Sequence, residues 1–370
     1  MSAPLPTLAQ LLSPFPVHAF LRQYDGKGPA LLRPVVSTPL DLARLDALVA
    51  RTVLTWPAVH VEDAHGAVHP DTYTLPEARS GVAWRIDVGA LAEALGAGHR
   101  VVLSELQRHH APTAHLVRAF EQALHMRGSA TAVLAPHSAG PRTLRAEGVH
   151  RHLLQCSGFR ACTVVGPDGH EDTFEVTAGC ALYVPPQHAV TMAPARGPSL
   201  SVDLTLKPMR ARDVAAAELA TVSREALRAC APVGVLARPG AASEQWAGMV
   251  DELLDDADHQ AALESLVDRF VQTRLPSLRG QLHALDTRLE PHTRLRRRPG
   301  VMARVVDLDD AVELRFHGKV VRFPYGGGEL ARYVSESPEW RPADLSSVPE
   351  PNRLELAGHL VAEGLCEVLT

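Results

Sequence analysis

From Thr131 to Leu206 the chain carries six short apolar runs: Thr131-Ala-Val-Leu134, Leu153-Leu-Gln155, Ala161-Cys-Thr-Val-Val165, Thr173-Phe-Glu-Val176, Ala181-Leu-Tyr-Val184 and Leu200-Ser-Val-Asp-Leu-Thr-Leu206. Clusters of Gly, Pro and Asp separate the runs. Short apolar runs at regular intervals, bounded by turn residues, are typical of an all-β barrel or sandwich. This stretch therefore predicts a small β-barrel at the centre of the chain.

The composition limits the classes of function. The chain has 370 residues, which is long for one domain, and 46% of them are apolar. A net charge of -5 gives no general attraction to nucleic acid or to an anionic membrane. The five cysteines include no Cys-x-x-Cys pair, which favours reduced thiols in a cytosol. We find neither a secretory signal nor a membrane-length apolar run, so we expect a cytoplasmic protein without a membrane partner.

The segments around the barrel differ in pattern. Residues 1–128 mix helices and strands. After Lys207-Pro208, residues 211–231 and 245–273 form long amphipathic segments, whose apolar stripe favours packing against a partner subunit. The last 70 residues give three strands and two helices. We therefore predict an α+β protein with three domains: a barrel over 1–208, a helical region over 209–290 and a small mixed module over 291–370.

Four pieces of sequence carry a family resemblance. In chain order they are the opening Leu11–Tyr24 followed by Gly28–Pro34, then Ala135-Pro-His-Ser-Ala-Gly140, then Gln155-Cys-Ser-Gly158-Phe-Arg160, then Leu182-Tyr-Val-Pro-Pro186. Their order resembles the JmjC-type, cupin-like 2-oxoglutarate oxygenases, specifically the three-domain ribosomal-oxygenase branch. The resemblance implies a double-stranded β-helix (jelly-roll) barrel, a helical dimerisation region and a C-terminal winged helix. It also implies Fe(II) and 2-oxoglutarate as cofactors, and hydroxylation of a peptide or protein side chain.

The implied iron site is incomplete in this sequence. The family holds Fe(II) with a His-x-Asp pair and a distal histidine. Arg145 stands at the first position and Glu147 at the carboxylate position, and arginine has no lone pair for a metal. An ungapped count puts the distal ligand at Val190, while a turn two residues shorter would make it His188. Arg160 stands where the family grips the far carboxylate of 2-oxoglutarate, so Arg145 and Arg160 are the candidate cofactor-binding residues.

His150 and His152 offer a second candidate for the metal. His-x-His is a general cupin metal pair, and with His188 it would make a three-histidine site for Fe, Zn, Cu or Ni. Side chains alternate between the faces of a strand, so Arg145 and Glu147 share one face and the two histidines share the other. Both pairs point inward only if a bulge or turn near Gly148 resets the alternation.

Three functions remain open from the sequence. The first is a hydroxylase, with Glu147 and His188 as catalytic and metal residues and His150 or His152 as a third ligand. The second is a non-catalytic module that keeps the peptide groove and the dimer but has lost iron. The third is a three-histidine metalloenzyme. We expect a homodimer whose substrate or partner is a peptide or protein, either a ribosomal protein or a biosynthetic precursor peptide.

Basic residues do not favour a nucleic-acid function. Arg294, Arg296, Arg297 and Arg298 form one cluster, which either contacts RNA or is a solvated linker. The last helix mixes Arg353 and His359 with Glu355 and Glu363, so it is not a basic recognition surface and we expect no DNA binding.

Overall fold

The computed structural model describes residues 6–34, 38–51, 55–75, 84–145, 148–194, 197–223, 225–228, 243–274 and 288–369. The chain divides into two units, the first being Pro4–Pro208 and the second containing Met209–Thr370. The three domains expected from the sequence, 1–208, 209–290 and 291–370, stay a prediction.

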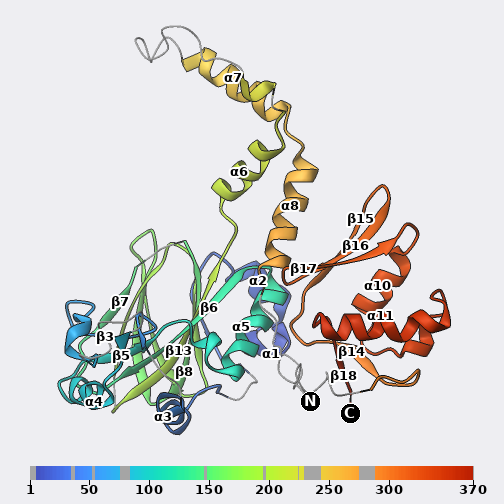
Figure 1. Ribbon diagram of the computed structural model, residues 1–370. Coiled ribbons are helices and arrows are strands. Elements are labelled where there is room, and N and C mark those ends of the chain that lie inside the picture. Colours follow the sequence, from blue (N-terminus) through green and yellow to red (C-terminus); the bar gives the residue numbers. More distant parts are fainter. Residues whose placement is uncertain are drawn as a thin grey trace. The chain divides into compact units, whose positions relative to one another are not determined.

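The described part of the first unit is built on two large antiparallel sheets (Figure 1), and it also contains the short antiparallel pair of β2 (Thr55–Trp56) and β4 (Trp84–Arg85). The larger sheet has, in spatial order, strands β1 (Ala30–Leu32), β11 (Ala181–Val184), β8 (His150–Ser157), β13 (Ser199–Lys207), β6 (Arg127–Ala135), β5 (Arg100–Leu103) and β3 (Val59–Glu62). The smaller sheet has strands β10 (Glu171–Thr177), β9 (Phe159–Val165), β12 (Ala189–Pro194) and β7 (Arg142–Leu144). All six predicted apolar runs lie within these strands, whereas β7 and β12 were not predicted.

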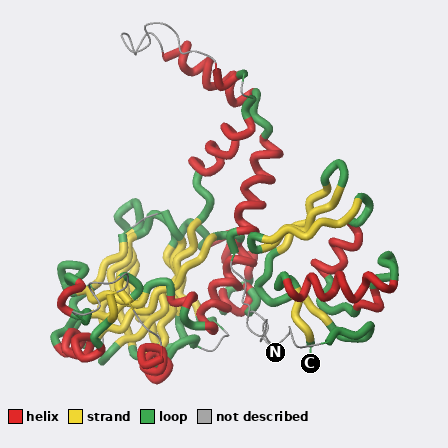
Figure 2. The backbone as a smooth tube through the Cα atoms, viewed as in Figure 1, coloured by secondary structure: helices red, strands yellow, loops and turns green. Residues whose placement is uncertain are grey.

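The larger sheet separates two cores because successive side chains of a strand point to opposite faces. One face of β8 and β13, with Leu154 and Leu204, packs in a large cluster with Phe20 and Phe120 from the helices. These helices are α1 (Leu8–Leu12), α2 (Val17–Gln23), α3 (Leu42–Arg51), α4 (Val88–Gly96) and α5 (Ala111–Leu124). The opposite face meets the smaller sheet around the barrel core: Leu153, Cys162, Val164, Val176, Leu182, Val184, Val190 and Met192. Figure 2 shows the strands and the helices of this unit in separate colours.

The connection from β8 to β9 is a tight turn at Gly158. Its φ is +74°, and a Cβ atom there would lie 2.1 Å from the backbone oxygen of Pro198. Only glycine combines this backbone conformation with so close an approach. The turn therefore holds Arg160, two residues later, at the start of β9.

The second unit begins with helices α6 (Ala211–Thr221), α7 (Ser243–Asp255) and α8 (His259–Gln272). The single segment predicted over 245–273 is thus two helices, because Asp258 accepts a hydrogen bond from the amide of Ala261 and caps a new helix. The remaining elements are β14 (Leu295–Arg297), β15 (Ala303–Asp307), β16 (Ala311–Phe316), β17 (Lys319–Pro324), α10 (Gly328–Glu336), α11 (Glu350–Ala362) and β18 (Cys366–Val368).

Strands β15–β17 form one antiparallel sheet, and β14 pairs with β18. Their core includes Leu314, Phe316 and Trp340. Asp268 of α8 makes ion pairs with Arg304 and Arg315 and so ties the helix to β15 and β16. No described helix is long and apolar enough to cross a membrane.

Candidate functional site

A cluster of charged side chains lies inside the barrel at the end where β8 turns into β9. Its members come from five different strands and are Glu62 (β3), Arg100 (β5), Arg142 (β7), Arg160 (β9) and Asp203 (β13). We call these five residues the arginine cluster. Alternation along β13 places Ser201 and Asp203 inside the barrel, because Leu200, Val202 and Leu204 pack on the outer face.

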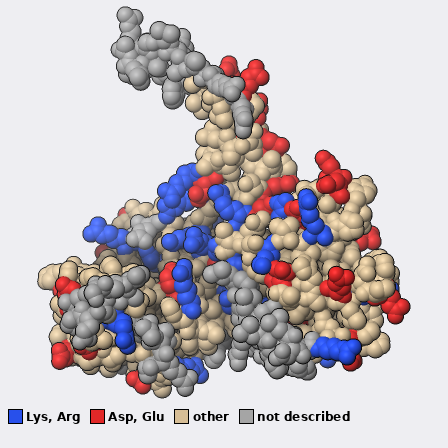
Figure 3. Space-filling model, viewed as in Figure 1, with Lys and Arg blue, Asp and Glu red and all other residues tan. Residues whose placement is uncertain are grey.

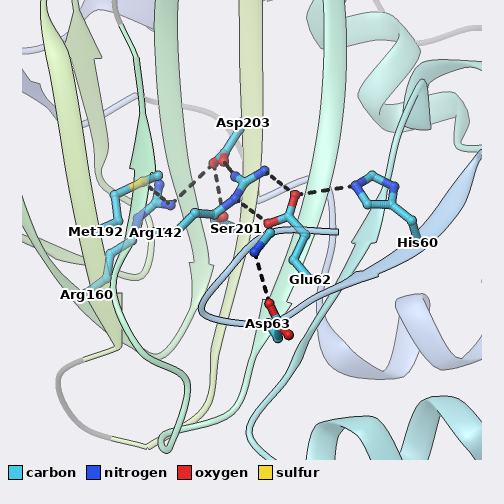
Figure 4. A network of polar contacts seen from close by, with 9 residues as sticks. His60, Glu62, Asp63, Arg142, Arg160, Met192, Ser201 and Asp203 are labelled. Carbon is cyan, nitrogen blue, oxygen red and sulfur yellow. Dashed lines mark hydrogen bonds and ion pairs between the residues drawn. The ribbon is translucent and has the colours of Figure 1, made fainter. Parts of the chain in front are cut away.

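Arg142 links the two carboxylates of the cluster (Figure 4). Its Nε and Nη2 atoms lie 2.8 Å and 3.2 Å from the two carboxylate oxygens of Glu62. Its Nη1 atom lies 3.4 Å from Oδ2 of Asp203. This two-point contact with Glu62 holds the guanidinium in one orientation.

Asp203 also pairs with Arg160. Arg160 Nη1 lies 3.3 Å from Oδ1 of Asp203, and the hydroxyl of Ser201 donates to the same oxygen at 3.0 Å. The Sδ atom of Met192 lies 3.3 Å from Arg160 Nη1. Arg160 is 4% exposed and Asp203 6% exposed, so this ion pair is screened little by solvent. The guanidinium expected to hold a cofactor carboxylate is therefore paired with a carboxylate of the chain itself.

The charges of the arginine cluster do not balance. Three guanidinium groups face two carboxylates, which leaves one positive charge in excess. Burial raises the pKa of Glu62, but hydrogen bonds from His60 and Arg142 outweigh it and bring the pKa down to about 2. Burial lowers the pKa of Arg100, and the nearby Arg142 lowers it further. Within the arginine cluster, the buried nitrogens without a hydrogen-bond partner are Nη2 of Arg100 and both Nε and Nη2 of Arg160.

The predicted metal residues lie elsewhere. Arg145, which was expected at the first ligand position of the implied iron site, is exposed in the segment after β7. Glu147 lies outside the described residues. His188 is half-buried in the turn between β11 and β12, where its Nδ1 lies 3.2 Å from the carbonyl oxygen of Pro186.

His150 and His152 lie on the same face of the larger sheet, the outer one. Side chains two residues apart on a strand are expected to share a face. The Nδ1 atom of His150 lies 2.9 Å from the hydroxyl of Tyr183 and 3.4 Å from a carboxylate oxygen of Asp25. The ring of His152 packs 4.4 Å from that of Phe120, and burial lowers its pKa to about 3. Gly148 does adopt a positive φ of +66° before β8, yet both histidines face away from the barrel core.

These positions contradict the predicted three-histidine site, because its three members do not lie together. His188 lies in a turn of the barrel, while His150 and His152 pack under the helices. Among the residues that the structure describes, no three His, Cys, Asp or Glu side chains come together in a way that could hold a metal ion. Apolar side chains of the barrel core, none more than 5% exposed, fill the part of the interior beside the arginine cluster. The described donor set therefore does not fit an iron site.

Of the arginine cluster, only Arg160 is predicted from the sequence. Glu62, Arg100, Arg142 and Asp203 are found only in the structure. One signal was present: polar and apolar residues alternate strictly from Ser199 to Leu206, which predicts a polar row on one face of the strand. Arg142 and Glu62 are 80 positions apart, and nothing local in the sequence connects them.

Comparison with known proteins relates the chain to others by fold. No protein-family model and no curated protein matches this sequence. The structure is similar to that of YcfD, a ribosomal oxygenase from Escherichia coli, with 17% sequence identity, a TM-score of 0.56 and coverage of 100% of both chains. The structure of YcfD in complex with cobalt and 2-oxoglutarate is 16% identical, with a TM-score of 0.56 over 96% of this chain and 99% of that chain. This chain therefore has a mixed α/β fold, with several antiparallel sheets, that is similar to the fold of a ribosomal oxygenase.

Proposed function

We propose that this protein is a binding module of the ribosomal-oxygenase fold, which recognises a peptide or protein partner without iron-dependent hydroxylation. The observation that carries the proposal is the buried ion pair between Arg160 and Asp203. An internal carboxylate meets the guanidinium that the family resemblance assigns to 2-oxoglutarate. The outward-facing histidines and the filled barrel core support the same reading. The partner classes are a ribosomal protein and a biosynthetic precursor peptide.

Hydroxylation with Fe(II) and 2-oxoglutarate is the second candidate. The likeness to YcfD bound to cobalt and 2-oxoglutarate favours it, as does the position of Arg160 inside the barrel. In this case Glu147 and His188 would hold the iron, which would supply oxygen activation, and Arg160 would orient the carboxylate. Arg160 would then have to exchange Asp203 for the cofactor.

One experiment separates these two candidates. We expect the purified protein, loaded with Fe(II) under anaerobic conditions, to retain far less than one iron per chain. A site with two protein ligands in place of three binds metal much more weakly. We also expect no decarboxylation of 2-oxoglutarate with ribosomal or precursor peptides. The measurements are metal analysis after desalting and succinate release.

The variants Glu147→Ala and His188→Ala complete this test. On the binding-module proposal, neither variant changes the iron content. Stoichiometric iron in the wild type that disappears in both variants, together with succinate release, would instead establish the hydroxylase.

We further propose that the barrel is a double-stranded β-helix, that 291–370 is a winged-helix-like module, and that the helices of the second unit form a homodimer. Helices α6 and α8 pack on each other through a small core of Ala217, Ala262 and Leu266. Large apolar side chains remain exposed on the same helices: Val214, Leu219, Leu263 and Val267. Figure 3 shows broad uncharged areas in this part of the second unit. A second copy of the chain would cover this surface.

The exposed pair on α8 gives the test of the dimer. Leu263 is 54% exposed and Val267 40% exposed, and they lie one helical turn apart. We expect the wild type to have a dimeric mass by light scattering at micromolar concentration, and Leu263→Glu with Val267→Glu to have a monomeric mass. Ser265→Glu, on the opposite exposed side of the helix, is the control and stays dimeric. A monomeric wild type would refute the proposal.

A further inference from the structure

Strand β10 is a long open edge of the smaller sheet. Its seven residues, Glu171–Thr177, pair with β9 on one side, and no described strand pairs with the other side. The other end strands of the two large sheets are shorter, with three residues in β1 and β7 and four in β3. Sheets usually protect an edge with a short strand, a bulge, a proline or a lysine. The β10 edge has none of these, so a further strand can pair with it.

Alternate residues of β10 leave their backbone groups unpaired. The amide of Gly166 donates to the carbonyl oxygen of His170 at 2.8 Å and closes the turn between β9 and β10. Because the hydrogen bonds of an antiparallel pair alternate from this point, the even-numbered residues of β10 bond to β9 and the odd-numbered residues point away from it. No hydrogen bond of the described chain uses the backbone groups of three odd-numbered residues: Glu171, Thr173 and Glu175.

The side chains along this edge are acidic. The odd-numbered side chains are exposed, whereas Val176 on the other face is fully buried in the barrel core. Glu171 lies opposite Val165 of β9 and Glu175 lies opposite Ala161, so neither has a basic neighbour across the strand pair. Neither glutamate makes an ion pair within the described part of the chain. The edge therefore combines unpaired backbone groups with two negative charges that no cation neutralises.

We propose that the β10 edge binds an extended basic segment of a partner protein, which pairs with β10 as an additional strand. The inference rests on the proposed binding-module function and names the chemistry of the partner. Backbone hydrogen bonds to the odd-numbered residues supply affinity, as in other cases of strand addition. Two basic side chains four residues apart in the partner lie beside Glu171 and Glu175, and opposite charges on neighbouring strands stabilise the pairing.

The charge of the edge favours this partner over a second copy of the chain. Pairing between two β10 strands would bring the glutamates of both copies together, and neither strand contains a basic residue. Like charges on neighbouring strands destabilise a strand pair. The two glutamates therefore oppose self-pairing and select a segment of opposite charge.

A synthetic peptide tests the site on the full-length protein. The probe is Thr-Arg-Val-Thr-Val-Arg-Thr, whose two arginines are four residues apart. Fluorescence anisotropy is expected to show saturable binding of this peptide and no binding of a peptide with the acidic sequence of β10 itself. Bound probe is also expected to protect the amides of Glu171, Thr173 and Glu175 from hydrogen exchange, because they become hydrogen-bonded.

N-methylation of the probe separates strand pairing from simple attraction of charges. In the added strand the amides of the two arginines face β10 and the amides of the two valines face away. N-methylation of both arginines is expected to weaken binding about tenfold or more, because two hydrogen bonds are lost while the charge is unchanged. N-methylation of both valines is the matched control and leaves the affinity as it was.

Charge reversal on the protein completes the test. Glu171→Lys combined with Glu175→Lys is expected to weaken binding of the arginine probe about tenfold or more. The same double variant is expected to bind a probe with glutamates in place of the arginines, a gain that a damaged fold would not give. Glu93→Lys changes an exposed glutamate of α4 and leaves binding as in the wild type.

The outcomes separate this inference from the proposed function. Absence of saturable binding, or an unchanged affinity in the double variant or with the N-methylated arginines, would overturn the β10 site. Equal binding of the acidic peptide would overturn it as well. None of these results bears on iron, whereas stoichiometric iron with succinate release would overturn the binding-module proposal whatever the peptide does.

Discussion

Replacing Asp203 with alanine is expected to lower the free energy of unfolding of the first unit by about 3–5 kcal/mol, the usual cost of removing one partner from a buried ion pair. Asp203 accepts hydrogen bonds from Arg142, Arg160 and Ser201. Without it, Arg160 remains a buried cation with no paired carboxylate. The measurement is native-state hydrogen exchange of the amides of β8 and β13, which reports on the first unit alone.

A surface ion pair is the matched control for this prediction. Arg108 Nε lies 3.2 Å from a carboxylate oxygen of Glu105 in the same unit, but the Arg108 side chain is 64% exposed, so Arg108→Ala is expected to cost less than about 1 kcal/mol. The double variant Asp203→Ala with Arg160→Met is expected to recover part of the lost stability, because it also removes the unpaired charge. Equal costs for Asp203→Ala and Arg108→Ala would show that the buried pair stabilises the first unit no more than a surface pair does.

On the binding-module proposal, the carboxylate of the buried pair takes the place of a bound cofactor anion inside the barrel. A guanidinium inside a barrel is stable only if an anion accompanies it. In an enzyme that anion can be a cofactor, which arrives and leaves. Here Asp203 is part of the chain, so Arg160 has a carboxylate partner whether or not a ligand is bound. The same arrangement that stabilises the barrel would oppose binding of a cofactor carboxylate to Arg160.

The β-strands of the barrel could be predicted because their signal is local. Short apolar runs between Gly, Pro and Asp residues placed six strands within a few residues of their true limits. Strand β12 was missed because Ala189–Pro194 mixes Ala, Thr and Pro with only two large apolar residues, Val190 and Met192. Its strand geometry comes from pairing with β9 on one side and β7 on the other.

The site could be predicted only in part, since its geometry depends on which face of each strand lies inside. Alternation showed that His150 and His152 share a face, but the sequence does not say which face meets the helices. The structure answers this through Phe120 and Leu204, which pack with His152 on the outer side. The partners of Arg142 come from β3 and β13, and such distant pairing leaves no periodic signal.

His152 makes the stability of the barrel depend on pH. Its pKa is about 3 in the folded chain, below the ordinary value of 6.5, because burial disfavours the imidazolium and the neighbouring His150 adds to this. The unfolded chain therefore binds the proton more strongly, so the stability is complete above pH 6.5 and is lost as the pH falls toward 3. Between pH 8 and pH 5 we expect a loss of about 2 kcal/mol from this residue. Burial also lowers the pKa of His150, which acts in the same direction.

Replacing His152 with leucine removes the titratable imidazole and keeps the packing against Phe120. In His152→Leu, the difference in unfolding free energy between pH 8 and pH 5 is expected to shrink by about 2 kcal/mol. His170→Leu is the control, because the His170 side chain is 71% exposed and its removal leaves the difference unchanged. The measurement is urea unfolding at both pH values, followed by pulsed hydrogen exchange in β8 and β13. If His152→Leu lost as much stability at pH 5 as the wild type, the buried imidazole would not be the group that titrates.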